Sequence, residues 1–427
     1  MGKFDGGFSL GKLFKKGTYW ISSRTVLKVK NHREDVKAAA ALAEWQKKRS
    51  RGGKIRCCFI VQMPEVWNKQ QRVYHKLEAD DRFEVWMLLV PNYRMDLERL
   101  SDSYGNEKEF FEAECGNGNL IYALENGKYA EIDFNRFDYV FYQRPYDWYL
   151  PEKYQSNYVV GKAGVCYVPY ATNELSKPVT YPQSFFRDIY LGFMENEHAA
   201  ELNTKRYSKA CDSGLQHFLN VGYPPFEECL EIAGECGYKK VLWTPRWTYA
   251  PIIGGSHFVE YVQPLIDYEW GDAELCVRPH PLMWQEFTRT GKMTQQQIDD
   301  VLAAWKEHGI TQDSNKEILD SFAASDILIS DNSSVIPMYF LTGKPIIYCV
   351  YGSDFDPLFH TIMPGMYVAK SWEDVKKYLD QLLAHDDPLK SVREKIIKEH
   401  FYVHDHASDH IVEALAKDYF QNDTHKE

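Results

Sequence analysis

The sequence predicts an α/β protein with two consecutive parallel-sheet domains behind a basic N-terminal arm. The chain has 427 residues, which is more than one hydrophobic core usually supports. From residue 54 onward, apolar runs of strand length alternate with stretches of helical length. The alternation occurs in two series, which divide the chain into an arm (1–53), a first domain (54–205) and a second domain (206–427). Two such domains in succession predict facing sheets with a cleft between them.

The composition is that of an ordered globular protein, with 44% hydrophobic and 15% aromatic residues. Its 29 Tyr and 11 Trp exceed the needs of core packing and suit sugar-like ligands, wet interfaces or a membrane boundary. No apolar run approaches the roughly 20 residues that span a bilayer, and the N-terminus lacks the apolar core of a signal peptide. We therefore expect a cytoplasmic protein. The nine Cys show no paired metal spacing, so buried reduced thiols are expected rather than disulfides or zinc.

The arm is basic, whereas the rest of the chain is acidic. Residues 1–56 contain 15 Lys/Arg and 4 Asp/Glu, although the whole chain has a net charge of −11. Val36, Ala40 and Trp45 can share one face of a helix in this arm. Such a segment can attach to the inner face of an anionic membrane, or it can pack as a helix on the first domain, and the sequence leaves both open. An acidic body without a binding motif argues against nucleic acid as a partner.

The first domain opens with a strand–helix–strand unit. KIRCCFIVQ (54–62) reads as a buried strand, PEVWNKQQRVYHKLEAD as a helix and FEVWMLLVP as the next strand. The unit spans fewer than about 40 residues, as a βαβ crossover does. FDYVFYQRP (137–145) and NYVVGKAGVCYVPYA (157–171) are predicted to be strands that end in loops.

The second domain repeats this alternation from about residue 215. Its predicted strands are KKVLWT, AELCV, SDILIS and KPIIYCVYG, and each of the first three runs directly into a polar loop. Its predicted helices are FVEYVQPLIDY, TQQQIDDVLAAWKEHGI, VIPMYFLTG and the long segment 371–401, which is broken at Pro388.

The three polar loops of the second domain predict a binding site. They are TPRWTY (244–249), RPHP (278–281) and SDNSS (330–334). Because the carboxyl ends of parallel strands meet at one sheet edge, these loops can converge. They bring together cationic, hydroxyl and helix-start donors that suit a diphosphate. The side chains concerned are Arg246, Arg278, His280, Ser333 and Ser334, with Asp331 and Asn332 beside them.

Each loop also has a purely structural interpretation. SDNSS can be a helix cap, since Ser, Asp and Asn are the preferred capping residues. Asp331 is a carboxylate where an anion site does not want one, unless it orients a donor or binds a ligand hydroxyl. RPHP can be a rigid turn, and TPRW can be a packed loop with Arg246 in an ion pair. The shared position of all three at strand ends favours the site.

The ordered set TPRW, RPHP and SDILISDNSSVIPMYFLTGKPIIYCVY (325–351) resembles the CDP-glycerol glycerophosphotransferase family, which includes teichoic acid polyol-phosphate polymerases. The ending HFYVHDHASDHIVEALAK (400–417) is similar to the family's terminal helix. The resemblance implies two Rossmann-like domains of the GT-B arrangement. It also implies transfer of a polyol phosphate, such as glycerol or ribitol phosphate, from a CDP-linked donor to a hydroxyl of a surface glycan or lipid-linked acceptor, with loss of CMP. His280 and Arg278 are then the candidate catalytic residues, and the other loop residues bind the donor diphosphate.

The first domain departs from the family pattern. Family polymerases carry a His-Gly motif in an N-terminal-domain loop, whereas the corresponding segment here, GVCYVPYATNEL (164–175), has no His. Tyr167 and Tyr170 stand in that loop, and a neutral Tyr is a poor base near pH 7. Asp147, Glu174, His198 and His257 are further candidates for this role, and the sequence does not rank them. His257 follows the run Gly254-Gly255-Ser256 after the TPRWTY loop and can enter the cleft from there, although a lone His can also be structural.

Two alternatives to the transferase stay open. A GT-B glycosyltransferase for capsule or surface polysaccharide shares the two-domain scaffold and differs in using a nucleotide sugar. A non-catalytic glycan- or nucleotide-binding homologue would bind the donor without turnover. We expect no cofactor and no obligatory metal at the predicted site.

Overall fold

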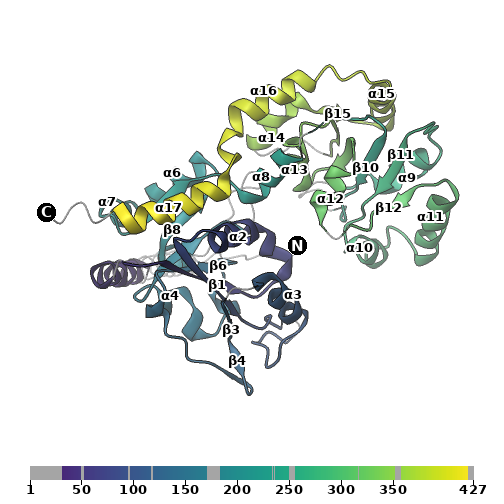
Figure 1. Ribbon diagram of the computed structural model, residues 1–427. Helices are drawn as coiled ribbons and strands as arrows, with labels where there is room; N and C mark the ends of the chain where they lie inside the picture. The colour runs from purple at the N-terminus through teal and green to yellow at the C-terminus, as the bar shows by residue number, and fades with distance from the viewer. Residues whose placement is uncertain are drawn as a thin grey trace, which may run out of the picture.

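The computed structural model describes residues 31–49, 52–94, 97–116, 119–170, 183–232, 234, 236–249, 255–315, 317–351 and 357–421. Figure 1 shows two α/β bodies. One is built on a seven-stranded sheet and the other on a six-stranded sheet. The predicted fold class, two Rossmann-like domains with a helix at the N-terminal side, is confirmed.

The first sheet is parallel throughout and has the strand order β3-β2-β1-β6-β7-β8-β9. Its central strand β1 has the sequence IRCCFIV and is buried along almost its whole length, as a strand covered on both faces requires. The strands are β1 (Ile55–Val61), β2 (Phe83–Leu89), β3 (Asn119–Tyr122), β6 (Tyr139–Tyr142), β7 (Gly164–Tyr167), β8 (Ile189–Met194) and β9 (His217–Asn220), and a separate hairpin pairs β4 (Leu124–Glu125) with β5 (Lys128–Tyr129).

The helices of the first sheet are mostly short. The segment after β1 forms a 3-10 turn before its α-helix, because Pro64 fits the first turn of a helix, where no N–H is needed. Residues 157–159, predicted as part of a strand, belong to a short helix, α4, instead. The elements are η1 (Pro64–Lys69), α2 (Gln71–Ala79), α3 (Asn106–Cys115), η2 (Phe134–Arg136), η3 (Asp147–Tyr149), η4 (Glu152–Tyr154), α4 (Ser156–Val159), α5 (Gln183–Phe186), α6 (Glu197–Arg206) and α7 (Ser208–Asp212).

The second sheet is also parallel, with the order β12-β11-β10-β13-β14-β15. Along β13, Ile327 and Ile329 belong to one hydrophobic cluster and Leu328 to another, so side chains alternate between two cores on opposite faces. The strands are β10 (Lys240–Thr244), β11 (Glu274–Val277), β12 (Thr311–Gln312), β13 (Ile327–Asp331), β14 (Ile346–Cys349) and β15 (Tyr367–Ala369).

The helices of the second domain agree with the predicted pattern. Helix α11 begins with a capping box formed by Thr294 and Gln297, and the long C-terminal segment breaks around Pro388 as expected. The elements are α8 (Pro224–Glu231), α9 (Phe258–Ile266), α10 (Met283–Arg289), α11 (Gln295–Glu307), α12 (Ile318–Ala323), α13 (Val335–Phe340), α14 (Pro357–Ile362), η7 (Met363–Gly365), α15 (Trp372–Leu383), α16 (Lys390–His400), η8 (Tyr402–His404) and α17 (Ala407–Gln421).

Both sheets reverse their strand order at one point. In the first sheet the reversal lies between β1 and β6, and in the second between β10 and β13. Ligands of open α/β sheets bind outside the carboxyl ends of the strands at such a switch point. The fold therefore marks one candidate position for a ligand in each domain.

The boundary predicted at residue 205 needs correction. Strand β9 (His217–Asn220) is hydrogen-bonded to β8 and completes the first sheet. Helix α17 also returns to the first domain, where it lies beside α2 and its buried residues Ile411, Leu415 and Tyr419 join the first core (Figure 1). We therefore place the division after residue 220 and assign α17 to the first domain. The sequence does not reveal strand β9, because a strand as short as HFLN gives little periodic signal.

The chain passes between the domains twice, and the two passages are joined. Glu227 in α8 accepts hydrogen bonds from the Ser408 N–H at 2.9 Å and the Ser408 hydroxyl at 2.6 Å. The N–H of Tyr223 donates to Nδ1 of His404 at 3.0 Å. His404 is 1% exposed, and this burial lowers its pKa to about 3.

The helix over residues 31–48 packs on the first domain through one apolar face. Ala38, Leu42 and Trp45 are buried on that face, whereas Val36 is 55% exposed, so the predicted face through Val36 is wrong in register. Just after the helix, Arg49 forms an ion pair with Asp418 at 2.8 Å and has only 2% of its side chain exposed. The part of the arm before residue 31 lies outside the described residues.

The nine Cys are all free thiols, and six of them are buried. Within the described residues, no helix is both long enough and apolar enough to cross a membrane.

Candidate functional site

The candidate site lies at the switch point of the second sheet, where β10 and β13 end side by side. Thr244 pairs with Ser330 in the ladder between these strands. The Thr244 hydroxyl donates to the Ser330 Oγ at 2.8 Å, and Ser330 is fully buried. This bond fixes the last rung, so that the loops after β10 and β13 leave the sheet together.

Asp331 is the centre of the site. Its Oδ2 accepts a hydrogen bond from the N–H of Arg246 at 2.9 Å, and its Oδ1 faces Nδ1 of His257 at 2.6 Å. The N–H of His257 also points at this carboxylate, at 3.3 Å and 3.4 Å from its two oxygens. With 1% exposure, Asp331 orients protein donors and is not available as a free anion. The presence of a carboxylate beside a predicted anion site is thus explained by its contacts with protein donors.

The ring of His257 is fixed by the Asp331 carboxylate and by two tyrosine rings. It lies directly before α9, and its ring stacks on Tyr261 at 4.9 Å and meets Tyr351 edge-on at 5.4 Å. Gly255 permits this packing, because a Cβ there would come within 2.3 Å of the Tyr351 ring. Since Nδ1 faces the carboxylate and Nε2 has no hydrogen-bond partner among the described residues, Nε2 is the atom left for chemistry.

Arg246 lies over the turn that follows β13. Its Nη1 donates to the carbonyl oxygen of Asn332, and its buried Nε has no partner in the described part of the chain. Burial lowers the pKa of Arg246, although the nearby Asp331 carboxylate opposes that shift. A second anion beside this guanidinium would therefore be favourable.

The two serines of the turn do not act as a strong helix cap. Ser334 is the N-cap of α13 but makes no side-chain capping bond, and the Ser333 hydroxyl accepts from the Val335 N–H only at 3.5 Å. The capping interpretation therefore accounts poorly for both hydroxyls. They remain exposed or half-buried at the carboxyl edge of β13.

His280 lies within electrostatic range of Arg246. Its ring stacks on Trp247 with centroids 5.5 Å apart, and its Nδ1 accepts a hydrogen bond from the Leu282 N–H at 3.2 Å. Burial and then the Arg246 charge lower the pKa of His280, so its neutral form is favoured. With Nδ1 as acceptor, the neutral ring carries its proton on Nε2 and can donate it to a ligand oxygen.

Arg278 differs from the prediction. Its Nη1 donates to Asp313 at 2.7 Å, to the Asn315 carbonyl at 2.9 Å and to the Ser321 hydroxyl at 3.0 Å. Asp313 follows β12, so this ion pair draws the guanidinium toward the neighbouring strand. These bonds join the loops after β11 and β12, and the described contacts of Arg278 do not connect it with Asp331 or His257.

Two of the residues predicted for the acceptor side, Tyr167 and Tyr170, lie in the first domain, and their surroundings differ. Tyr167 at the end of β7 is fully buried, with its ring packed on Phe185 and Phe186. Tyr170 is half-buried and shares a 2.8 Å hydrogen bond with the Tyr146 hydroxyl, and burial raises the Tyr170 pKa. Neither phenol is suited to act as a base.

Asp147 also lies on this side, but its carboxylate is occupied. It accepts from the N–H and the hydroxyl of Ser156, both at 2.8 Å. His198 is exposed in α6, and Glu174 lies outside the described residues.

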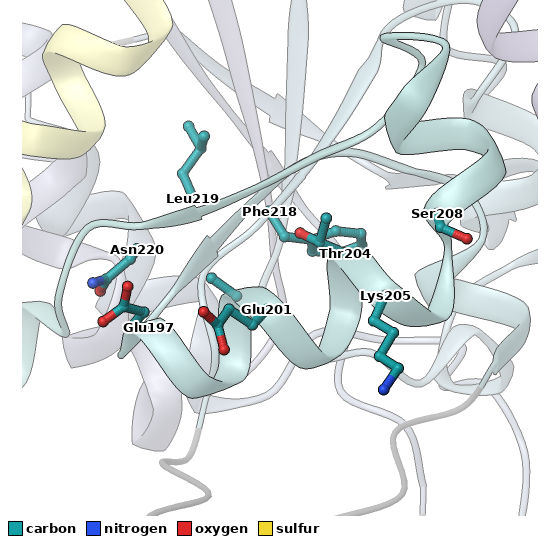
Figure 2. Close-up of a pocket in the computed structure, with 9 residues that line it drawn as sticks. Glu197, Glu201, Thr204, Lys205, Ser208, Phe218, Leu219 and Asn220 are labelled. Carbon is teal, nitrogen blue, oxygen red and sulfur yellow. The ribbon is translucent and has the colours of Figure 1, made fainter.

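Two other features of the structure do not serve as the site. A pocket of about 510 Å³ lies between α6 and the edge strand β9, away from both switch points; Figure 2 shows the polar ends of Glu197, Glu201 and Lys205 along α6. In the described residues, a group with metal-ligand spacing is formed by Glu227, His406 and Asp409. Lys76 already bridges those two carboxylates, at 3.3 Å and 2.6 Å, so the group is an ion-pair network of the domain crossing.

The key pairing that sequence reasoning missed is the contact between His257 and Asp331, which are 74 residues apart. Asp331 and His257 were each named separately, and the only signal for their pairing was that both flank loops at the same sheet edge. Trp247 was also missed as the surface on which His280 stacks.

Residues 237–417 match the protein family described as CDP-glycerol:poly(glycerophosphate) glycerophosphotransferase, which confirms the predicted resemblance for this part of the chain. A search of curated proteins finds no significant match. The match includes every element of the second sheet and ends within α17.

Solved structures resemble the whole chain in fold. A UDP-N-acetylglucosamine 2-epimerase aligns with a TM-score of 0.54 at 15% identity, over 88% of this chain and 98% of that one. A variant of the wall teichoic acid polymerase TagF aligns with a TM-score of 0.53 at 13% identity, over 96% and 99%. The epimerase from Neisseria meningitidis bound to UDP-GlcNAc aligns with a TM-score of 0.52 at 12% identity, over 85% and 100%. These likenesses agree with the predicted GT-B arrangement of two Rossmann-like domains.

Proposed function

We propose, from the family match of residues 237–417, that this chain is a CDP-glycerol-type transferase. It moves a polyol phosphate, such as glycerol phosphate or ribitol phosphate, from a CDP-linked donor to a hydroxyl of a surface glycan or lipid-linked acceptor and releases CMP. The observation that carries the proposal is the cluster of Arg246, His280 and the Asp331–His257 pair at the switch point of the second sheet.

The donor diphosphate is assigned to the carboxyl edge of β10 and β13. Arg246 supplies a positive charge, and the neutral His280, which lies within electrostatic range of Arg246, supplies an Nε2–H donor. The Ser333 and Ser334 hydroxyls and the amide of Asn332 complete the donor set from the turn after β13. Charge-stabilising donors of this kind are most of what a phosphoryl-transfer enzyme must supply.

The reaction requires a base for the acceptor hydroxyl, and we assign His257. The acceptor O–H gives its proton to Nε2 of His257 as its oxygen bonds to the phosphorus that carries the polyol. The P–O bond to the cytidylyl phosphate breaks, and CMP leaves with the electron pair. Asp331 holds Nδ1 at 2.6 Å and favours the imidazolium that forms.

This assignment supplies what the first domain lacks. Tyr167 is buried in the core and Tyr170 has a raised pKa, so neither replaces the His expected there. A His-Asp pair from the donor domain can perform the same proton transfer if the acceptor enters between the domains. We also propose that the reaction needs no metal. Full activity in excess EDTA is expected, and loss of activity that magnesium restores would contradict this point.

The test is release of CMP. Purified full-length protein is incubated with CDP-glycerol or CDP-ribitol and an acceptor extract, and CMP is measured by chromatography. Turnover with either CDP-polyol supports the proposal if, at a donor concentration below the parent KM, it is strongly reduced in Arg246→Ala and retained in Arg289→Ala. Arg289 is a matched control because it is an exposed arginine on α10, paired only with Glu286 of the same helix.

Two outcomes would replace the proposal with its alternatives. Turnover of a nucleotide sugar without any release of CMP from CDP-polyols would indicate a glycosyltransferase on the same scaffold. Binding of CDP-glycerol without turnover of any donor would indicate a non-catalytic homologue.

A further inference from the structure

We propose that the carboxyl edge of the first sheet carries an acceptor subsite that binds a phosphorylated sugar, with the sugar ring on an aromatic surface and its phosphate on Arg144. Calling this an acceptor subsite rests on the proposed function. The binding of a phosphorylated sugar is inferred from the residues of the first domain alone. The aromatic surface consists of Tyr93, Tyr146, Trp148, Tyr149 and Tyr170.

The subsite lies at the switch point of its sheet. Gln62 directly follows β1, and Gln143 and Arg144 directly follow β6. The Gln143 side chain accepts from the N–H groups of Gln62 and Met63 at 2.7 Å and 2.9 Å, and it donates to the Met63 carbonyl at 3.1 Å. Both glutamines are buried, at 4% and 5% exposure. Buried amides thus fix the two loops between which a ligand of this fold binds.

Arg144 is a half-buried cation with no acidic partner among the described residues. Its Nη2 donates to Oε1 of Gln62 at 2.8 Å, and its guanidinium lies 4.5 Å from the centre of the Tyr149 ring. Burial lowers the pKa of Arg144, and the neighbouring tyrosines and Glu65 oppose that shift only in part. A phosphate can accept from this guanidinium in bidentate fashion and would relieve the cost of its burial.

The aromatic surface is built from rings that hold one another. Tyr146 contacts Trp148 at 5.0 Å and Tyr170 at 5.8 Å, and its hydroxyl bonds to that of Tyr170 at 2.8 Å. Tyr149 contacts Tyr93 at 5.0 Å, and its carbonyl accepts from Nε2 of Gln62 at 2.9 Å. Trp148 also contacts Tyr149, at 5.6 Å between ring centroids, and has 53% of its surface exposed.

Such a surface suits a sugar. The C–H face of a sugar ring packs on aromatic rings, while phenol hydroxyls at the rim bond to its hydroxyl groups. The Asp147 carboxylate, held by Ser156, keeps the short helix η3 that carries Trp148 and Tyr149 in place. The rings are therefore positioned before any ligand arrives, which reduces the entropic cost of binding.

The subsite lies on the side of the first domain that faces the second. Lys69 in η1, the element that follows β1, is half-buried and lies within electrostatic range of Glu228 in α8 and Glu317 before α12. Glu65 of the same η1 lies within electrostatic range of Arg144. Aromatic residues also anchor proteins at membrane interfaces, but such anchors occupy an outer surface. Because the subsite lies beside the other domain, we assign it to a phosphorylated sugar and not to the surface of a bilayer.

The test uses saturation-transfer NMR on the full-length protein with glucose 1-phosphate, glucose and inorganic phosphate as probes. Glucose 1-phosphate is expected to bind at least tenfold more tightly than either glucose or phosphate, because only it engages both parts. Trp148→Ala and Arg144→Gln should each weaken its binding about tenfold or more. Tyr402→Ala and Arg289→Gln, which change an exposed ring and an exposed arginine elsewhere, should leave it unchanged.

Unchanged binding in both Trp148→Ala and Arg144→Gln, with thermal unfolding like that of the parent, would overturn the inference. Loss of binding to anionic vesicles in Trp148→Ala, with sugar phosphate binding intact, would overturn it in favour of a membrane contact. Failure of the proposed function has a different signature: no CMP is released from any CDP-polyol, while glucose 1-phosphate still binds and still depends on Trp148 and Arg144.

Discussion

Replacing Asp331 by Asn tests the proton-transfer pair of the candidate site. The substitution keeps the size of the side chain but removes its charge and half of its acceptor capacity. Asp331 now accepts from the Arg246 N–H and lies 2.6 Å from Nδ1 of His257. In Asp331→Asn an amide N–H₂ must face one of these donors, so His257 loses its fixed orientation and the support for its protonated form.

The expected effect on catalysis is large. A positioned general base contributes on the order of 10²–10⁴ to the rate, and loss of its orienting carboxylate removes most of that. The kcat should therefore fall about 100-fold or more, with a smaller change in the KM for the donor. One unsatisfied buried donor also costs about 1–3 kcal/mol of stability, or roughly 2–10 °C in the thermal midpoint of a domain of this size.

The stability loss needs a matched control, and the same strand provides one. Asp326 directly precedes β13 at the opposite edge of the sheet and accepts from the N–H groups of Gly237, Lys239 and Lys240, each at 3.0 Å. Asp326→Asn should lower the thermal midpoint to a similar degree and leave kcat within about threefold. CMP release at saturating donor measures kcat for both variants, and calorimetry measures the midpoint.

A double-mutant cycle with His257→Gln completes the test. If His257 and Asp331 act as one unit, the double variant should be no slower than the slower single variant. The reasoning is refuted if Asp331→Asn keeps more than a third of the parent kcat, or if Asp326→Asn reduces kcat equally.

Three other predictions follow from the described contacts. Arg246→Ala should raise the donor KM about 10- to 100-fold, as loss of charge-assisted bonds worth about 1.5–3 kcal/mol would, with Arg289→Ala unchanged; equal donor KM values in both would contradict the assignment. His404 has a folded pKa of about 3 against an ordinary value of 6.5, so the unfolded chain binds the extra proton between these values and stability decreases as pH falls from 6.5 toward 3. The slope should reach at most about 1.4 kcal/mol per pH unit and should be absent in His404→Asn, as followed by urea unfolding at pH 7, 6 and 5; an equal slope in that variant would assign the effect to other groups. Deletion of residues 1–30 should release the protein from anionic vesicles in a flotation assay while the helix over 31–48 stays packed, and unchanged flotation would dismiss the membrane contact.

The sequence predicted the convergence of three distant loops because one rule governs them all. Parallel strands end at a common edge, so polar residues after strands must meet there whatever their separation in the chain. Arg246 and Asp331 follow this rule and are in direct contact. Arg278 follows the rule too, but its side chain is directed toward Asp313. Asp313 comes directly after the two-residue strand β12, which has no recognisable sequence pattern.

Other differences between prediction and structure also arise from tertiary contacts. The helix over 31–48 has two apolar stripes that satisfy helical spacing, and contact with Tyr190 at 4.7 Å decides how Trp45 and its face are oriented. Helix α17 was assigned to the second domain because it is contiguous with it in sequence. Its apolar face instead covers the first core, which no local pattern indicates.

The most direct test of the donor-site assignment is a structure of the protein in complex with CDP-glycerol. We predict that the diphosphate lies at the carboxyl edge of β10 and β13, with its oxygens within hydrogen-bond distance of Arg246, Nε2 of His280 and the hydroxyls of Ser333 or Ser334. A nucleotide bound at another edge of either sheet, or a diphosphate out of reach of Arg246 and His280, would contradict the account.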